Sequence, residues 1–457
     1  TDGWKSMARD KYLGITCHGI CRSTWTLESF LLKLVHISKS ASAERLVALI
    51  KTALDEWGIT PDKIVNITTD GAPNMKNTAE LLEIPWIYCA SHIINRSVFL
   101  AIEKVDVISA LVKKAHNICL FFRSQPGKSD LEEKMALTRA SAKVLTMSTP
   151  TRWGSVFKMF KRLLLARDAI RICQTLDRTG MTPNFADHEW AMLTELRDVL
   201  QNLHETSQFL SQQKTTTIGV TGYLFATILR THLSDEGVAD DLVDPVIAEF
   251  KNVLATDLRS RIRILGSNVN DELLLAIYLD PRSKEFDYVD DASVRKRTLQ
   301  KAKELTAALL QEGGSANTIY KDGDEEHVND EETARAWARQ IRIFGNRARN
   351  AQCALSNTRT WDQELDDYHG LPSYDLFESE KMMTDPLAWW RANESSFPRV
   401  AALARRYLCI TPTSVPCERI FSAGGRTVTK TRCSLSVERT PILVFLMCNK
   451  HHMPPNT

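Results

Sequence analysis

Strand-like runs dominate the start of the chain. Runs rich in β-branched and aromatic residues, separated by turn residues, lie at 1–6, 12–20, 25–32 and 64–69. Between the third and fourth runs, apolar residues recur at helical spacing from Ser42 to Trp57, and Gly58 ends this predicted helix. The pattern predicts three antiparallel strands, a helix and a fourth strand, which is an α/β arrangement.

The middle of the chain has the period of helices. Apolar positions at helical spacing run from His92 to Phe122 and again from Asp187 to Leu210. No fixed-period repeat is visible, so a solenoid is not favoured. Two stretches, near 311–332 and 356–385, are polar with few periodic apolar residues, and we interpret both as surface loops or linkers.

The stretch from Thr411 to Asn449 is patterned differently from the rest. It predicts a short helix over 415–422 with Ser414 as N-cap, a stop at the double glycine 424–425, a basic turn, and an apolar helix over 437–448. Between 399 and 432 there are seven Lys or Arg residues and one acid, Glu418. This carboxylate either lies on an ordinary exposed helix face or has a specific task among the cations.

Composition narrows the classes of protein only a little. The chain has 457 residues, enough for two or three domains, with 43% hydrophobic, 25% charged and 8% aromatic residues, as in ordinary globular proteins. The formal charge of +2 does not by itself indicate a nucleic-acid partner. The near-balance hides segregation, because the acidic run 322–332 offsets basic stretches at 259–263 and 295–303.

Ten cysteines without a Cys-x-x-Cys pair are typical of reduced thiols in a cytosolic or nuclear protein. No apolar run is long enough to span a bilayer, so we expect no membrane partner. The sequence begins without methionine and already inside a predicted strand. We therefore expect it to be a fragment, with any N-terminal module, such as a zinc finger, outside it.

Seven motifs in order carry a family resemblance. They are D-x-W at 2–4, T-T-D-G-A-x-N-M at 68–75, C-A-S-H at 89–92, T-R-W at 151–153, L-D-P-R-x-K at 279–284, W-W-x-x-N-x-x-x-F-P at 389–398, and S-x-x-x-E-R-x-F-S-x-x-G at 414–425. Together they resemble the hAT family of transposases over essentially the whole chain, closest in character to animal proteins that carry BED zinc fingers. Lys5, Ser283, Pro416-Cys417 and Cys433 depart from the family pattern, but none of these departures removes an expected metal ligand.

The resemblance implies a ribonuclease-H-like catalytic fold interrupted by a large all-α insertion. The implied parts are residues 1–92 and 397–457 for the two portions of the catalytic domain, the second being the C-terminal dimerisation segment, and 93–396 for the insertion. Strands one and four are neighbours in that fold, which would bring Asp2 and Asp70 together. Taken alone, Asp70-Gly71 is equally well explained as a turn.

The chemistry implied is cleavage and transfer of DNA strands at the ends of a mobile element. Asp2, Asp70 and Glu418 fall on the catalytic positions of the family and would hold two Mg²⁺ ions, or Mn²⁺, roughly 4 Å apart. One ion activates the attacking hydroxyl and the other stabilises the leaving oxygen. We expect the three carboxylates to converge.

The resemblance also implies DNA-binding residues. Trp153 would stack on a base flipped out near the element end, with Arg152 supporting the flanking DNA, although Trp153 is equally well explained as a core anchor. His92 and Cys89 would lie beside the acids, with His92 contacting phosphate, although a packed cysteine with a hydrogen-bonded histidine explains them too. The remaining expected contacts are cations of the C-terminal block: Arg419, Arg426, Lys430 and Arg432.

A structural zinc site is not expected. Cys89 and His92 form one pair, whereas such sites normally take four ligands, and the nearest second pair, Cys448 and His451, lies at a predicted helix end.

Three functions remain open at this stage. The first is a nuclear transposase that acts as a homodimer or higher homo-oligomer and whose acid triad is retained. The second is a domesticated relative, a nuclear DNA-binding and dimerising regulator of transcription that does not cut. The third is a pure dimerisation scaffold that uses the apolar C-terminal helix. In each case the expected self-association residues are Ile442, Leu443, Phe445 and Leu446.

Overall fold

The computed structural model describes most of the chain. The described residues are 1–5, 11–37, 41–125, 127–138, 144–149, 152–177, 180, 182–234, 244–262, 270–315, 360–379, 382–427 and 439–450, with the backbone alone at 4–5, 312–315, 377–379, 382–383, 423 and 425–427. The structure is mostly helical, with small sheets.

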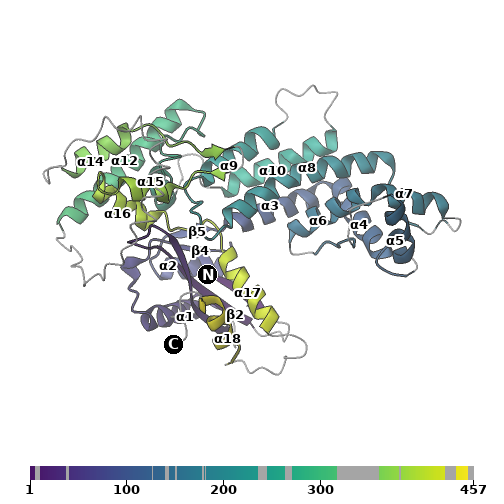
Figure 1. Ribbon diagram of the computed structural model, residues 1–457, viewed down its shortest axis with the longest axis horizontal. Helices are drawn as coiled ribbons and strands as arrows, with labels where there is room; N and C mark the ends of the chain where they lie inside the picture. Colours follow the sequence, from purple (N-terminus) through teal and green to yellow (C-terminus); the bar gives the residue numbers. More distant parts are fainter. Residues whose placement is uncertain are drawn as a thin grey trace, which may run out of the picture.

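Five strands from the front of the chain form two small sheets that lie next to each other (Figure 1). Strands β1 (Asp2–Lys5), β2 (Lys11–Ile20) and β3 (Leu27–Ile37) pair antiparallel, and β4 (Ile67–Thr69) and β5 (Trp86–Tyr88) pair parallel. The amino group of Thr1 donates a hydrogen bond to the carbonyl of Thr68 (2.9 Å), which joins the start of β1 to β4. The predicted meander is therefore present, and its first strand lies beside the fourth.

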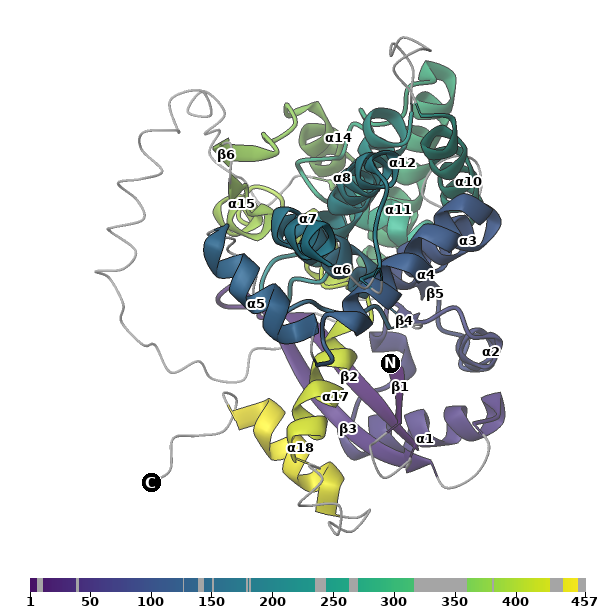
Figure 2. The ribbon, with the colours of Figure 1, turned by 90° about the vertical axis from the view of Figure 1, so that its right-hand side faces the viewer.

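Helices cover both faces of the three-stranded sheet. Side chains alternate along β2 and β3, so that Leu13 and Leu32 pack under α1 (Ala43–Glu56) and α2 (Pro73–Leu81), whereas Tyr12 and Leu34 point to the opposite face. That opposite face is covered by α17 (Val415–Thr427) and α18 (Arg439–Asn449), as Figure 2 shows. The C-terminal segment thus completes a layer of the domain that the first residues begin.

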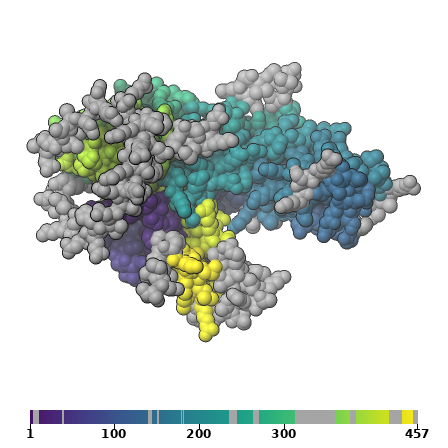
Figure 3. All heavy atoms as spheres, viewed as in Figure 1, coloured from purple at the N-terminus to yellow at the C-terminus, as the bar shows by residue number. Residues whose placement is uncertain are grey.

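A long helical region follows the sheets and extends away from them (Figures 1 and 3). Its helices are α3 (Ala90–Lys104), α4 (Asp106–Phe121), α5 (Gly127–Leu137), α6 (Trp153–Leu165), α7 (Arg167–Leu176), α8 (Asp187–Leu210), α9 (Thr221–Thr227), a π-helical turn (Ile228–His232) and α10 (Pro245–Arg261). The continuous helix expected over 92–122 is broken at Val105, which has extended backbone angles. Helix α8 has the predicted bounds.

Another group of helices joins the helical region to the C-terminal segment. It consists of α11 (Asp271–Tyr278), α12 (Ala292–Ser315), α14 (Trp361–Gly370), α15 (Pro386–Asn393) and α16 (Pro398–Tyr407). A separate 3₁₀ turn, Pro61–Lys63, lies much earlier in the chain, before β4. The two buried carboxylate oxygens of Glu364 lie at the start of α16, where one accepts hydrogen bonds from the amides of Arg399 (2.8 Å) and Val400 (2.9 Å). Such a contact satisfies amides that have no partner inside their own helix.

One expectation about irregular segments is wrong, and a second is tested only over residues 311–315. Residues 356–385 are not a loop throughout, because α14 buries Leu365 and Tyr368, and because β6 (Phe377–Ser379) pairs with β7 (Met382–Met383). These two strands also show that the region 93–396 is not wholly α-helical. Of the stretch 311–332, residues 311–315 belong to α12, and 316–332 lie outside the described residues.

The double glycine at 424–425 does not stop its helix, since α17 continues to Thr427. Glycine lowers helix stability by only about 1 kcal/mol, and here the helix packs against β2, β1 and α18, so that packing outweighs the local preference. No helix within the described residues is both long enough and apolar enough to cross a membrane.

Candidate metal and nucleic-acid site

Three segments far apart in the sequence bring acidic and imidazole groups to one place. Asp2 comes from β1, His92 from the first turn of α3, and Glu418 from the first turn of α17. One potential ligand atom from each residue lies within 4.8 Å of those of the other two. Among the residues that the structure describes, this is the cluster of side chains with metal-ligand spacing.

The environment of Asp2 opposes its ionisation. Its side chain is 7% exposed, and its carboxylate accepts a hydrogen bond from the amide of Gly3 (2.8 Å). Burial raises the pKa of Asp2 to about 6, and the nearby negative charge of Asp70 acts in the same direction, whereas the positive charge of His92 lowers the pKa and limits the rise. A neighbouring cation therefore stabilises the ionised form of this buried acid.

His92 is such a cation. Burial alone would lower its pKa, but its hydrogen bond and charge interaction with Cys89, followed by the charges of Asp2 and Glu418, outweigh burial and raise the pKa to about 9. Near neutral pH the imidazole is therefore positively charged and lies between two carboxylates.

Asp70 lies next to this group without belonging to it. It follows β4 directly, and its Oδ1 accepts a hydrogen bond from the amide of Ala72 (3.2 Å), which is the turn that an Asp-Gly pair favours. The adjacent Gly71 packs against the ring of Tyr88, where an added Cβ would lie 2.4 Å from a ring carbon, so only glycine fits. Asp70 is near enough to Asp2 to act on its pKa, but the group held within 4.8 Å does not include it.

Cys89 is buried and faces the C-terminal segment. It is 0% exposed, and its sulfur accepts a hydrogen bond from the amide of Ser414 (3.2 Å). Burial favours the neutral thiol, but hydrogen bonds with His92 and Ser414 and the charge of His92 outweigh it and lower the pKa of Cys89. The expectation that Cys89 contacts DNA is therefore wrong, because no ligand can reach a side chain that is fully covered.

The Arg152-Trp153 pair divides into one exposed and one buried side chain. The guanidinium of Arg152 is 72% exposed and lies 3.2 Å from the carboxylate of Glu418. It therefore joins the helical region to the cluster of Asp2, His92 and Glu418, which we call the acid group. Trp153 is 5% exposed and meets the ring of His204 edge to face, with a centroid distance of 6.0 Å. The expectation that Trp153 stacks on a base is wrong in this conformation, because its ring is part of the core, which is the alternative explanation given above.

The expected cations of the C-terminal block are placed only in part. Arg419 is exposed, and its Nη2 donates a hydrogen bond to the carbonyl of Ser211, the residue that follows α8 (2.8 Å). Arg426 lies on α17, but its side chain is outside what the structure describes, and Lys430 and Arg432 lie outside the described residues.

Helix α18 presents apolar side chains to solvent. Ile442, Leu443, Leu446 and Met447 are 38–60% exposed. Phe445 instead turns inward, with its ring 6.2 Å from that of Trp57, and packs with the sheet core. Of the four residues expected to mediate self-association, three are therefore available to a partner, and Phe445 mainly packs within its own chain.

The acid group fits a hard divalent cation in its donor chemistry. Carboxylate oxygens are the ligands that Mg²⁺ and Mn²⁺ prefer, and Asp2 and Glu418 supply them from opposite halves of the chain. The protonated imidazole of His92 has no free lone pair, so it would become a ligand only by losing its proton. A second ion would need the carboxylate of Asp70 to approach the other two.

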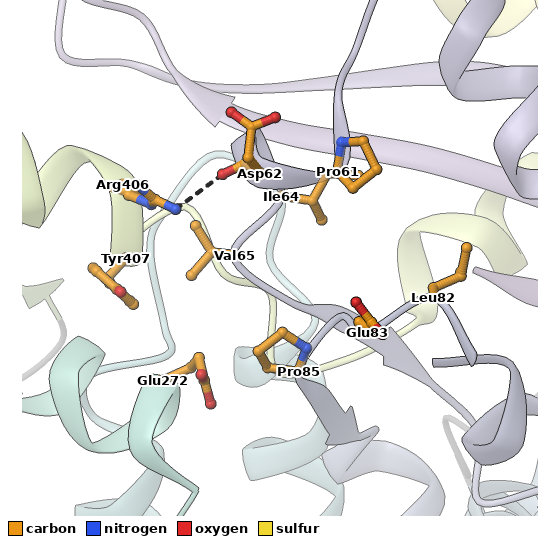
Figure 4. Close-up of a pocket in the computed structure, with 10 residues that line it drawn as sticks. All are labelled: Pro61, Asp62, Ile64, Val65, Leu82, Glu83, Pro85, Glu272, Arg406 and Tyr407. Atoms are coloured by element: carbon orange, nitrogen blue, oxygen red, sulfur yellow. Dashed lines mark hydrogen bonds between the residues drawn. The ribbon is translucent and has the colours of Figure 1, made fainter. Parts of the chain in front are cut away.

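A separate pocket of about 370 Å³ lies away from this chemistry (Figure 4). It is formed where the segments 61–65 and 82–85 meet Glu272 of α11 and the end of α16, and Arg406 donates a hydrogen bond to the carbonyl of Asp62 across it (3.0 Å). No residue of the acid group lines it. The pocket is therefore separate from the acid group.

Several residues that shape the site were not found from the sequence. Asn95 accepts a hydrogen bond from the amide of Trp153 (3.0 Å), and Thr68 donates its hydroxyl to the carbonyl of Thr411 (2.8 Å). Ser414 was predicted only as a helix cap, but its amide and hydroxyl both face the Cys89–His92 pair. Thr68 and Ser414 belong to the motifs that contain Asp70 and Glu418, so these motifs could have drawn attention to them. Asn95 lies outside the quoted motifs.

Comparison with protein families divides the chain into three matched parts. Residues 1–84 match the ZBED1 RNase-like domain, residues 87–199 match the ZBED1 RNase-like helical domain, and residues 364–449 match the hAT family C-terminal dimerisation region. The last match contains Glu418 and the exposed face of α18, and the first contains Asp2 and Asp70.

Three named relatives cover nearly all of this chain. An AC transposase of Zea mays is 23% identical over 98% of the chain and 56% of that protein. The human zinc finger BED domain-containing protein 4 is 20% identical over 98% of the chain and 37% of that protein. The zinc finger BED domain-containing protein RICESLEEPER 2 of Oryza sativa subsp. japonica is 24% identical over 94% and 61%. The chain thus spans about half the length of the curated relatives it matches.

Proposed function

The chain belongs to the hAT family of transposases, and on that premise we propose that it cuts and transfers DNA strands in the nucleus, at the ends of a mobile element. The observation that carries the proposal is the meeting of Asp2, His92 and Glu418 within 4.8 Å, from three separate segments. Grouped acids in a family of DNA-processing proteins favour phosphodiester chemistry.

A ribonuclease-H-like domain agrees with the arrangement of the strands. The order β3-β2-β1, with β4 and β5 beyond β1, and the helices on both faces support it. On this proposal residues 1–92 and 397–457 form the catalytic domain and 93–396 an inserted, largely helical domain. Asp2 and Glu418, from the two catalytic portions, would then hold the metal ion, and Asp70 would complete a site for two.

Divalent ions bound there would activate the attacking hydroxyl and stabilise the leaving oxygen. The chain's own groups have separate tasks. Asp2 and Glu418 present carboxylate oxygens to the ions, while the charged imidazole of His92 offsets the negative charge that these acids and a phosphate bring together. Arg152, exposed beside Glu418, is placed to contact the phosphate backbone.

Cleavage of DNA by the full-length protein tests this function. The substrate would carry the terminal repeats that flank the gene, with Mg²⁺ or Mn²⁺ added. We expect strand cleavage that falls by at least about 10³-fold, or roughly 4 kcal/mol in barrier height, in Asp2→Asn, Asp70→Asn and Glu418→Gln. Asp55→Asn, an exposed acid on α1, is the matched control and should keep full activity. Equal cleavage by the parent and all three acid variants would contradict the proposal.

Self-association through α18 is the second part of the proposal. Ile442, Leu443, Leu446 and Met447 form an exposed apolar face inside the segment that matches the hAT dimerisation region. We expect the double variant Ile442→Glu, Leu446→Glu to shift a dimer or larger oligomer to monomer in sedimentation, because charges cannot be buried unpaired. Leu176→Glu, an equally exposed leucine on α7, is the control. An unchanged oligomer in the double variant would refute this interface.

A second function has one observation in its favour. The cation of His92 already neutralises part of the charge of Asp2 and Glu418, so the acids can remain as an internal ion cluster without a metal. A domesticated DNA-binding, dimerising regulator of transcription would use the fold in that way. DNA binding and self-association without cleavage, under conditions where the metal is saturating, would select this function.

A further inference from the structure

The Cys89–His92 motif contacts the segment that leads into the helix of Glu418. Ser414 donates its amide hydrogen to the sulfur of Cys89 (3.2 Å), and Ala90 donates its own to the carbonyl of Pro412 (2.9 Å). The hydroxyl of Ser414 also lies 3.5 Å from Nδ1 of His92. Cys89 and Ser414 are 325 residues apart in sequence, so these contacts join the two ends of the chain.

The same short segment, 411–414, is attached to the strand that precedes Asp70. Thr68 of β4 donates its hydroxyl to the carbonyl of Thr411 (2.8 Å), and the amide of Cys89 donates to the carbonyl of Thr69 (2.9 Å). Segment 411–414 is therefore held between the end of β4 and the start of α3. Helix α17 begins at Val415, and Glu418 lies in its first turn.

A second set of contacts fixes the other side of α17. The ring of Phe421 packs directly on Gly14 of β2, where an added Cβ would lie 2.9 Å from it. The sulfur of Cys417 lies 3.4 Å from the hydroxyl of Thr16. These contacts hold the helix to the sheet, while segment 411–414, which precedes the helix, is held by the first set.

Neither zinc nor DNA accounts for Cys89. Within the described residues, the group with metal-ligand spacing contains His92 but not Cys89. Cys89 has no exposed surface, and its sulfur is used as an acceptor for a backbone amide. A buried acceptor that satisfies a backbone amide is a structural contact whose loss leaves that amide unpaired.

We propose that Cys89 and His92 are positioning residues that dock segment 411–414 and thereby hold the carboxylate of Glu418 beside that of Asp2. The docking itself follows from the contacts above; only its importance for cleavage rests on the proposed function. The role differs from that of a catalytic group, because the thiol of Cys89 acts on Glu418 through the backbone of Ser414.

Amide hydrogen exchange of the full-length protein tests the docking without reference to cleavage. Cys89→Ala should accelerate exchange of Ser414 and of the first turn of α17 roughly tenfold, because one buried hydrogen bond is lost. Cys89→Ser keeps an acceptor and should restore part of the protection. Cys119→Ala is the matched control, since Cys119 is also 0% exposed but lies in α4, and it should leave residues 412–422 unchanged.

Unchanged exchange over 412–422 in Cys89→Ala, or equal acceleration in Cys119→Ala, would overturn the proposal. If Cys89→Ala does not fold, Thr68→Val tests the same docking, because it removes the hydroxyl that holds Thr411 and should loosen the same segment. Cleavage measured in parallel separates the two hypotheses. A parent protein that never cuts, with local loosening in Cys89→Ala, would remove the nuclease function and leave the docking intact.

Discussion

Two clusters of charged side chains differ in how their charges are balanced. In the L-D-P-R-x-K motif, Asp280 and Arg282 are both fully buried and pair at 2.6 Å, and Arg282 also donates to the carbonyls of Thr384 and Thr216. Lys284 is buried as well, and its ammonium donates to carbonyls at the end of α14, including that of Tyr368 (2.8 Å). Every charge in this cluster meets an opposite charge or a carbonyl oxygen.

The acid group of Asp2, His92 and Glu418 is not balanced in this way. Two carboxylates and the nearby Asp70 face the imidazolium of His92, the exposed guanidinium of Arg152 and the amino group of Thr1, and among these described groups only Glu418 and Arg152 form a salt bridge. The L-D-P-R-x-K motif, in which every charge is paired, joins α11 to α14 and to the loop before α15. It therefore stabilises the fold. The acid group, whose carboxylates are not all held in direct ion pairs, is the one suited to bind a cation. Both clusters contain buried charges, so the difference between them lies in how completely each charge is paired.

The largest effect is expected in the balanced cluster. Arg282→Ala leaves Asp280 buried without its partner and should reduce the free energy of unfolding by about 3–5 kcal/mol, as measured by urea denaturation. Arg295→Ala removes a surface guanidinium that lies 3.3 Å from Asp287 and should cost less than about 1 kcal/mol. Similar losses in the two variants would mean that the buried Asp280–Arg282 pair stabilises the fold no more than an exposed surface pair does.

In the acid group, replacing Asp2 should raise the free energy of unfolding, whereas Arg282→Ala lowers it. The pKa of Asp2 rises from 3.8 to about 6 on folding, so between these pH values the folded chain binds more protons than the unfolded chain, and the contribution of Asp2 to stability is lost as the pH rises. Asp2→Asn removes that loss. In metal-free buffer it should match the parent near pH 4 and be more stable by up to about 3 kcal/mol at pH 7.

Urea denaturation at several pH values, with a chelator present, measures this difference between variant and parent. Asp55→Asn, an exposed acid, shows how much any loss of an aspartate contributes. A variant that is less stable than the parent at pH 7 would mean that the acid group is as well balanced as the Asp280–Arg282 pair.

The smallest effect on stability is expected at the exposed edge of the acid group. Arg152→Gln should change the free energy of unfolding by less than about 1 kcal/mol, because its pair with Glu418 is largely open to solvent. DNA binding should nevertheless weaken, and the slope of log affinity against log salt should fall by about 1 if Arg152 contacts a phosphate. Arg171→Gln, on α7, is the control, and an equal slope in both variants would exclude a phosphate contact by Arg152.

Local pattern predicted the elements whose apolar residues point one way. Helix α8 has the predicted bounds, because Trp190, Leu193, Leu196 and Val199 lie on one buried stripe. The break at Val105 was missed because valine continues the apolar stripe on both sides of it.

Helix α14 was missed because its sequence is mostly polar. It offers only three large apolar side chains, those of Trp361, Leu365 and Tyr368, which is too sparse a stripe to stand out from a polar loop. Its buried Glu364 is satisfied by the backbone of α16, a partner that the local sequence does not contain.

The candidate site depended on the family resemblance rather than on pattern. The motifs selected Asp2, Asp70 and Glu418 from many acids, and Asp2 and Glu418 do lie in one group. The resemblance also placed His92 beside the acids, where the structure has it. It left open whether Trp153 is buried, because the contact with His204 joins distant segments. Burial is decided by the whole fold, and a single motif does not contain that information.

The separation of Glu418 from Asp2 along the chain also has a consequence for synthesis. While the chain emerges from the ribosome, the strands of the sheet and the helical region are made before segment 411–414 and α17. Until then the acid group lacks one of its two closely placed carboxylates. A chain terminated before α17 would thus lack Glu418 and with it the assembled acid group.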